Sequence, residues 1–220
     1  MKINFKRVDS KSGKITSIVF FLHGYGSDGA DFLGIGDVLS EHLPDTLFIA
    51  PDAPMNCQMS ASGFQWFPIP TMDGSSEKDA LKKLNEISSI MNEWMDGILE
   101  SENVKSSNAV LFGFSQGTML SLHMGPRRSQ SLGGIIGFSG KIVDVEALKA
   151  TIISRPPVLL VHGDQDEVVS PLCMPEAVKE LEALKFKVRK HVSIGAGHEI
   201  SSDGLNEALR FLKDSVHYRA

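Results

Sequence analysis

The sequence predicts an α/β fold, in which one mainly parallel sheet is covered by helices on both faces. Short apolar runs of strand type alternate with segments of helical period, and mostly short turns join them. A chain of 220 residues has the size of one domain. Because no repeat, low-complexity tract or linker divides it, we expect a single domain over residues 1–220.

The composition of the chain excludes some classes of protein. The chain is 42% hydrophobic and 22% charged, as soluble globular proteins are. A net charge of −5 argues against binding to nucleic acid, which requires a basic face. The first apolar run, residues 15–22, contains Thr16 and Ser17 and leads into a glycine loop, so we expect neither a signal peptide nor a membrane span.

Cysteine usage indicates the compartment. Cys57 and Cys173 form neither a disulfide framework nor a metal-binding spacing. Such cysteine usage fits a reducing compartment, so we expect a cytoplasmic protein. We also expect no metal, because the sequence shows no cluster of metal ligands, and no cofactor. The sequence leaves open whether the protein is a monomer or a homodimer.

The first half of the chain begins with a buried strand and ends with a long helix. The strand at 18–22 is followed by a glycine loop, a helix over 30–42, and a second strand at 47–50. Residues 53–76 show no period and contain several prolines and glycines, which predicts a long loop near the active-site edge. Apolar residues at spacings of three and four then predict a helix opened by Ser76, with one stripe facing the core.

The second half repeats the alternation. A strand-type run at 109–112 leads through glycines into a helix from Gln116 to about residue 124. The expected elements that follow are a strand at 132–138, a helix at 144–153, a strand at 158–161, a helix at 171–184, a strand at 187–194 and a helix at 202–215.

The most informative motif is Gly113-Phe114-Ser115-Gln116-Gly117, a G-x-S-x-G between a strand and a helix. A serine at the apex of so tight a turn takes a strained conformation, and side chains two positions away on either side would collide. The turn would expose the Ser115 hydroxyl, and the Gln116 amide would point toward a developing oxyanion. The alternative is a surface serine in an ordinary turn, so an acid and a histidine must follow downstream.

The histidine and the acid have candidates in the expected order. His198 lies in a glycine loop after the last strand, whereas we expect His23 and His162 to bond neighbouring loop backbone. The loop after the strand at 158–161 offers Asp164, Asp166 and Glu167, and spacing alone does not choose among them. Asp164 can cap its own turn, while Asp166 lies farther out, toward an adjoining loop.

A second oxyanion donor must come from the loop after the first buried strand. That loop is His23-Gly24-Tyr25-Gly26, whose glycines let the backbone approach a substrate. We expect the backbone amides of Tyr25 and Gln116 to form the oxyanion hole.

With these motifs, the chain resembles the phospholipase/carboxylesterase family of α/β-hydrolases, which includes the acyl-protein thioesterases. The resemblance implies an α/β-hydrolase fold, with Ser115 as nucleophile, Asp166 rather than Asp164 as acid, and His198 as base. It also implies the Tyr25 and Gln116 amides as oxyanion donors, and hydrolysis of short- to medium-chain carboxylic esters, with thioesters or lysophospholipids as further candidates. The stretches that carry it run in family order: Phe21-Leu22-His23-Gly24-Tyr25-Gly26, Pro51-Asp52-Ala53-Pro54, Gln65-Trp66-Phe67, Gly113-Phe114-Ser115-Gln116-Gly117, His162-Gly163-Asp164-Gln165-Asp166 and Gly195-Ala196-Gly197-His198.

The loop at 53–76 departs from the simple form of protein-deacylating family members, so we do not carry protein S-deacylation over. It is rich in methionine and aromatic residues, and we expect Trp66, Phe67 and Met72 to contact the substrate as a wall of an acyl pocket. The alternative is a flap packed over the core.

Two other functions compete. Gly24-Tyr25-Gly26-Ser27-Asp28-Gly29 is a G-x-G-x-x-G with Asp52 at the end of the next strand, which would fit an NAD(P)-dependent oxidoreductase. Asp28 would repel a pyrophosphate there, and this hypothesis leaves Ser115, Asp166 and His198 without a role. The other competitor is a catalytically silent hydrolase fold that only binds a ligand.

Overall fold

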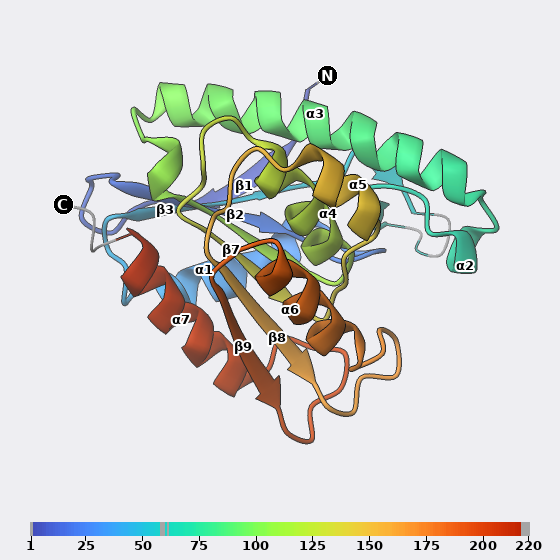
Figure 1. Ribbon diagram of the computed structural model, residues 1–220. Helices are drawn as coiled ribbons and strands as arrows, with labels where there is room; N and C mark the ends of the chain where they lie inside the picture. The colour runs from blue at the N-terminus through green and yellow to red at the C-terminus, as the bar shows by residue number, and fades with distance from the viewer. Residues whose placement is uncertain (1, 58–59, 61, 217–220) are drawn as a thin grey trace.

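The computed structural model describes residues 2–57, 60 and 62–216, and its main feature is a seven-stranded sheet (Figure 1). The sheet has the order β1-β3-β2-β6-β7-β8-β9, and only β1 is antiparallel to its neighbour. The predicted mainly parallel sheet in a single domain is thus confirmed. Its strands are β1 (Phe5–Val8), β2 (Ser17–Leu22), β3 (Thr46–Pro51), β6 (Ala109–Phe114), β7 (Gly134–Phe138), β8 (Val158–Gly163) and β9 (Val188–Ser193).

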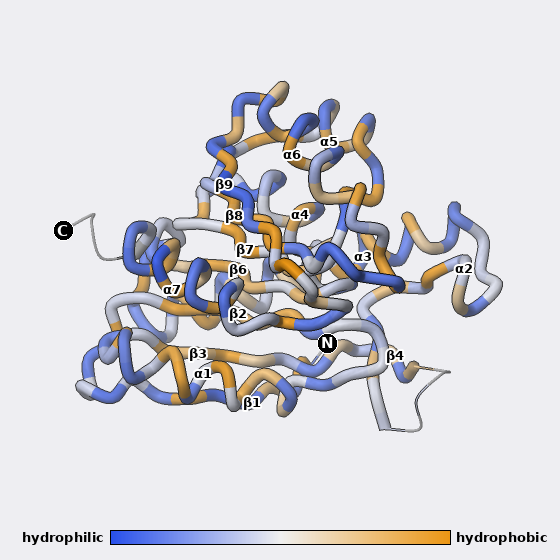
Figure 2. Tube along the Cα trace, turned by 90° about the horizontal axis from the view of Figure 1, so that it is seen from below, coloured by the Kyte–Doolittle hydropathy of each residue, from blue (hydrophilic) through white to orange (hydrophobic). Residues whose placement is uncertain are grey.

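Helices cover both faces of this sheet. On one face lie α1 (Leu33–Ser40) and α7 (Ser202–Val216); on the other lie α3 (Glu77–Ser101), α4 (Gln116–Met124), α5 (Val145–Thr151) and α6 (Cys173–Ala183). Neighbouring strand residues alternate between the two cores, so that Phe20 packs toward α3 and Phe21 toward α1. Strands buried on both faces are continuously apolar, and Figure 2 shows the hydrophobic residues gathered on the central strands.

The long predicted helix is α3, which runs along the top of Figure 1. Ser76 caps it, because its hydroxyl oxygen accepts a hydrogen bond from the Asp79 N–H at 3.0 Å. The predicted stripe faces the sheet, with Leu84 and Met91 fully buried. None of the helices in the described ranges is both long enough and apolar enough to cross a membrane.

The structure adds elements that the sequence pattern did not indicate. β1 was missed because it is a mostly exposed edge strand that contains Lys6 and Arg7, so it has no apolar alternation. The expected loop at 53–76 contains a two-stranded ribbon and one helical turn, too short to give a period. These are β4 (Met55–Asn56), β5 (Phe64–Gln65) and α2 (Pro70–Asp73).

Three short 3₁₀ turns complete the fold over the residues that the structure describes. They are η1 (Gly29–Phe32), η2 (Ser106–Asn108) and η3 (Gly125–Arg127). The helix expected at 30–42 therefore begins as the 3₁₀ turn η1 and becomes α-helical only in α1.

The order of the strands creates a crevice beside β2. The chain passes from β2 to β3 on one side, and the later strands extend from β6 on the other side. The loops that leave β2 and β6 therefore diverge, and such a switch point is where open α/β sheets bind ligands. The loop after β2 carries Gly24 and Tyr25, and the turn after β6 carries Ser115.

Candidate active site

Ser115 lies at the apex of the turn between β6 and α4, in a strained backbone conformation. Its φ is 51° and its ψ is −112°, which is unusual for a residue other than glycine. The Ser115 N–H donates to the Phe138 carbonyl of β7 at 2.9 Å, which ties the apex to the sheet. The expected crowding is present: a Cβ on Gly113 would lie 2.5 Å from the Gly117 backbone, and one on Gly117 would overlap the Leu22 carbonyl of β2.

We expect Gly117→Ala to destabilise the fold by about 3 kcal/mol or more, because the added carbon meets strand backbone that cannot move aside. Gly97→Ala is the matched control: nothing lies within 4 Å of that position in α3, and alanine favours a helix. Thermal unfolding of both variants checks this. A wild-type Tm for Gly117→Ala would show that the elbow can relax.

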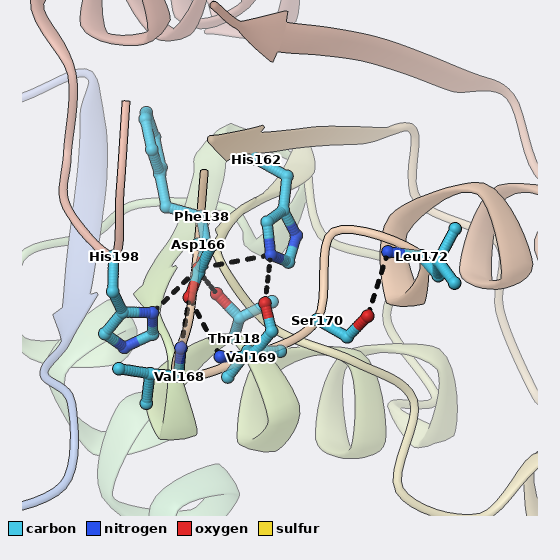
Figure 3. Close-up of polar contacts among 9 residues, drawn as sticks. All are labelled: Thr118, Phe138, His162, Asp166, Val168, Val169, Ser170, Leu172 and His198. Carbon is cyan, nitrogen blue, oxygen red and sulfur yellow. Dashed lines mark hydrogen bonds and ion pairs between the residues drawn. The ribbon is translucent and has the colours of Figure 1, made fainter. Parts of the chain in front are cut away.

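His198 and Asp166 meet at the ends of β8 and β9 (Figure 3). The His198 Nδ1 lies 2.8 Å from Asp166 Oδ2, and the Asp166 side chain is fully buried. The other oxygen, Oδ1, accepts hydrogen bonds from the backbone N–H groups of Val168 and Val169, both at 2.9 Å. Burial raises the pKa of Asp166, but the hydrogen bonds from His198, Val169 and Val168 outweigh it and hold that pKa below its ordinary value. Asp166 is therefore an ionised acceptor at neutral pH.

A second histidine contacts the same carboxylate. The buried His162 Nε2 lies 2.9 Å from the Val169 carbonyl and 3.2 Å from Asp166 Oδ2 (Figure 3). The expected backbone bond is present, but the contact with Asp166 was missed. The available signal was the spacing: His162 precedes Asp166 by four residues across a turn.

His23 also bonds loop backbone, as expected. Its Nδ1 lies 2.7 Å from the Gly24 carbonyl, and its Nε2 accepts from the Ala53 N–H at 3.0 Å. A ring nitrogen that accepts carries no proton, so this imidazole is neutral. Burial lowers the pKa of His23, which also favours the neutral form of the ring.

Asp164 supports the loop that carries His198. The sequence predicted that Asp164 caps its own turn. In the structure its Oδ1 accepts from the Gly195 N–H at 2.6 Å and so caps the turn after β9. The Ser193 and Ser201 hydroxyls, 2.6 Å apart, join the two ends of this loop. These contacts fix both ends of the loop and hence the place of His198.

Ser115 and His198 line one cavity of about 430 Å³, here called the Ser115 cavity. Gly24, Tyr25 and Phe114 also line it, and the Phe114 and His198 rings lie 4.8 Å apart. Among the described residues, no hydrogen bond joins the Ser115 hydroxyl to His198, and the N–H groups of Tyr25 and Gln116 have no protein acceptor. The structure thus brings four sequence-predicted loops together around one space.

The aromatic residues expected to contact substrate lie elsewhere. Trp66 and Phe67 are buried in the core and do not line the Ser115 cavity, which corrects that expectation. Trp66 Nε1 donates to the His23 carbonyl at 2.9 Å, and its backbone N–H donates to Gln116 Oε1 at 2.9 Å. Gln116 Nε2 donates in turn to the Phe67 carbonyl at 2.6 Å. The Trp66-Phe67 segment therefore links the 53–76 region to the loop after β2 and to the turn after β6.

Met72 does line the Ser115 cavity, with 42% of its surface exposed. The other apolar walls were missed in the sequence, because they come from separate elements: η1, α1, the end of β6 and the loops before α6 and α7. They are Phe32, Ile35, Phe114, Val168 and Ile200.

Comparison with known proteins shows the family of this chain. The model of the phospholipase/carboxylesterase family matches residues 3–216. The chain belongs to this family. The crystal structure of esterase PE8 superposes with a TM-score of 0.92 and 37% identity, covering 98% of this chain and 100% of that one.

Curated relatives of this hydrolase are named as thioesterases. Acyl-protein thioesterase 1 of Saccharomyces cerevisiae is 28% identical over 236 residues, which cover 97% of this chain and 99% of that protein. Acyl-protein thioesterase 1 homolog 1 of Dictyostelium discoideum is 25% identical over 207 residues, 91% of each chain. The protein is therefore a serine hydrolase of the carboxylic ester class with an α/β-hydrolase fold, as its motifs predicted.

The contacts of the glycine loop at 24–29 argue against a dinucleotide site. Asp28 Oδ1 accepts from the Ala30 N–H at 2.6 Å and caps η1, and Asp52 Oδ1 accepts from the Gly29 N–H at 3.0 Å. Both carboxylates thus hold the glycine loop in place. In a hydrolase, that loop lies where an oxyanion hole is needed.

Proposed function

We propose that this hydrolase cleaves short- to medium-chain carboxylic esters through Ser115, His198 and Asp166, with a covalent acyl-enzyme intermediate. The observation that carries the proposal is the buried contact between Asp166 and His198 at the wall of the cavity that Ser115 enters. A histidine held by a carboxylate beside a strained serine is the arrangement that activates a hydroxyl for acyl transfer.

The contact with Asp166 determines which nitrogen of His198 acts as the base. Nδ1 keeps its proton and donates a hydrogen bond to Asp166, so Nε2 is free to accept the proton of the Ser115 hydroxyl. Ser115 Oγ then attacks the ester carbonyl carbon. The N–H groups of Tyr25 and Gln116, which have no acceptor among the described residues, stabilise the negative charge that forms on the carbonyl oxygen.

His198 returns the proton to the leaving alcohol as the carbon–oxygen bond breaks, which leaves the acyl group on Ser115. A water molecule then loses a proton to His198 and attacks the acyl carbonyl. Release of the acid restores the Ser115 hydroxyl. A thioester follows the same steps with a thiol as leaving group, so thioesters are included in the proposal.

The size and lining of the Ser115 cavity support a short to medium acyl group. Its volume of about 430 Å³ lies toward the low end for small-molecule sites. Apolar side chains from Phe32, Ile35 and Ile200 can cover an alkyl chain but make no hydrogen bonds to it. The two cysteines, Cys57 and Cys173, are free thiols, which supports a reducing compartment such as the cytoplasm.

A fluorophosphonate probe tests the nucleophile, and an ester panel tests the substrate class. We expect the probe to form one adduct, which peptide mass mapping places on Ser115. We also expect kcat/KM for p-nitrophenyl esters to peak between acetyl and octanoyl and to fall at palmitoyl. An adduct on another residue, no adduct, or a maximum at palmitoyl would contradict the proposal.

A further inference from the structure

Two carboxylates lie in the wall of the Ser115 cavity and have no part in the mechanism above. Asp31 comes from η1, and Glu199 directly follows His198. They belong to different elements, yet both line the space that Ser115 and His198 share. The described lining contains neither lysine nor arginine.

No residue in the described part of the chain forms an ion pair with either carboxylate. Asp31 accepts a hydrogen bond from the uncharged hydroxyl of Ser27, and the ion pairs of the described chain include neither Asp31 nor Glu199. Both residues are exposed, so their charge faces whatever enters the cavity. A cleft that carries charge of one sign attracts ligands of the other sign and repels its own.

A third carboxylate strengthens the field. Asp73 follows Met72 at the end of α2. The pKa of the Tyr25 hydroxyl is raised to about 12, mainly by burial and then by Cys57, with a smaller contribution from the charge of Asp73. Its charge therefore reaches Tyr25, which lines the cavity. Asp73 has a structural task as well, since it accepts hydrogen bonds from the Ile69 and Ser75 N–H groups.

We propose that Asp31 and Glu199 make the Ser115 cavity select esters and thioesters that carry a positive charge and reject those that carry a negative charge. The favoured substrates have an ammonium group, or a basic residue of a peptide, near the scissile bond. Acyl groups carried on phosphate-bearing thiols are disfavoured. This inference rests on the proposed function, because it concerns the substrates of the same site.

Three butyrate esters that differ in charge test the proposal. Butyrylcholine is cationic, 3,3-dimethylbutyl butyrate is its uncharged isostere, and 2-sulfoethyl butyrate is anionic. Proton release in a pH-stat at low ionic strength gives kcat/KM for each ester in the wild type, Asp31→Asn, Glu199→Gln and the double variant. Intrinsic reactivity differs among the esters, so each variant is compared with the wild type by the cationic-to-neutral and anionic-to-neutral ratios.

In the double variant we expect the cationic-to-neutral ratio to fall about tenfold and the anionic-to-neutral ratio to rise by a similar factor. The single variants should show smaller changes of the same sign, and added salt should weaken the wild-type discrimination. Asp37→Asn is the matched control, because it removes an exposed carboxylate of α1 that does not line the cavity. Its ratios should equal those of the wild type.

Ratios that stay unchanged in the double variant would overturn the proposal, as would equal changes in Asp37→Asn. Activity on the neutral ester would persist in either case, and the proposed function would stand. Failure of the proposed function has a different signature: the wild type would hydrolyse none of the three esters and would not react with a fluorophosphonate. The ratios use the neutral ester as an internal reference, so partial loss of folded protein does not affect them.

Discussion

Ser115→Ala is expected to lower the rate of p-nitrophenyl butyrate hydrolysis by about 10⁶-fold, toward the uncatalysed rate. The loss is this large because the alanine has no oxygen to attack the carbonyl, and His198 then has no hydroxyl to deprotonate. The fold should persist, since alanine lacks only that oxygen and the Ser115 N–H still donates to Phe138. Release of p-nitrophenol, with circular dichroism on the same samples, measures both properties.

Ser27→Ala is the control for this variant. Ser27 is another serine in the wall of the Ser115 cavity, but it lies outside the strained turn. Its removal should change kcat/KM by no more than a few fold. If Ser115→Ala kept the wild-type rate, Ser115 would not be the nucleophile and the proposed mechanism would be wrong.

Asp166→Asn is expected to lower kcat by about 10⁴-fold while the protein stays folded. The carboxylate accepts from Val168, Val169 and His198, and an asparagine must replace one accepting oxygen by an NH₂ group. With two backbone donors on Oδ1, the NH₂ group would face His198. It would then donate to Nδ1, the proton of the ring would move to Nε2, and the base would be blocked. Steady-state kinetics with p-nitrophenyl butyrate measures the loss.

Asp164→Asn provides the comparison within the same loop. Asp164 accepts one hydrogen bond, from the Gly195 N–H, and an asparagine oxygen can accept it equally. We expect kcat to stay within a few fold of the wild type. If Asp164→Asn were the variant with the large loss and Asp166→Asn were mild, the acid would be Asp164.

Much of the fold is predictable from the chain because its signals are local. The central strands of the sheet are buried on both faces, so β2 and β3 appear as mostly apolar runs. The stripe and cap of α3 likewise need only neighbours in sequence. β1 and the ribbon of β4 and β5 carry no such signal, because their hydrogen-bond partners, and not their side chains, make them strands.

The glycines around Ser115, and the glycine loops after β2 and β9, mark the candidate site in the amino-acid order alone. The backbone at each of these places must turn sharply or pass close to another segment. Such positions require glycine, so they can be recognised in the sequence. Tertiary packing determines which acid contacts His198 and which side chains line the cavity. Only folding shows that Asp166 is buried against His198 while Asp164 bonds Gly195, and that Trp66 and Phe67 lie in the core, away from the cavity. These contacts join residues that are far apart along the chain. The distances between such residues depend on how the helices and strands pack, and a local sequence pattern contains no information on that packing.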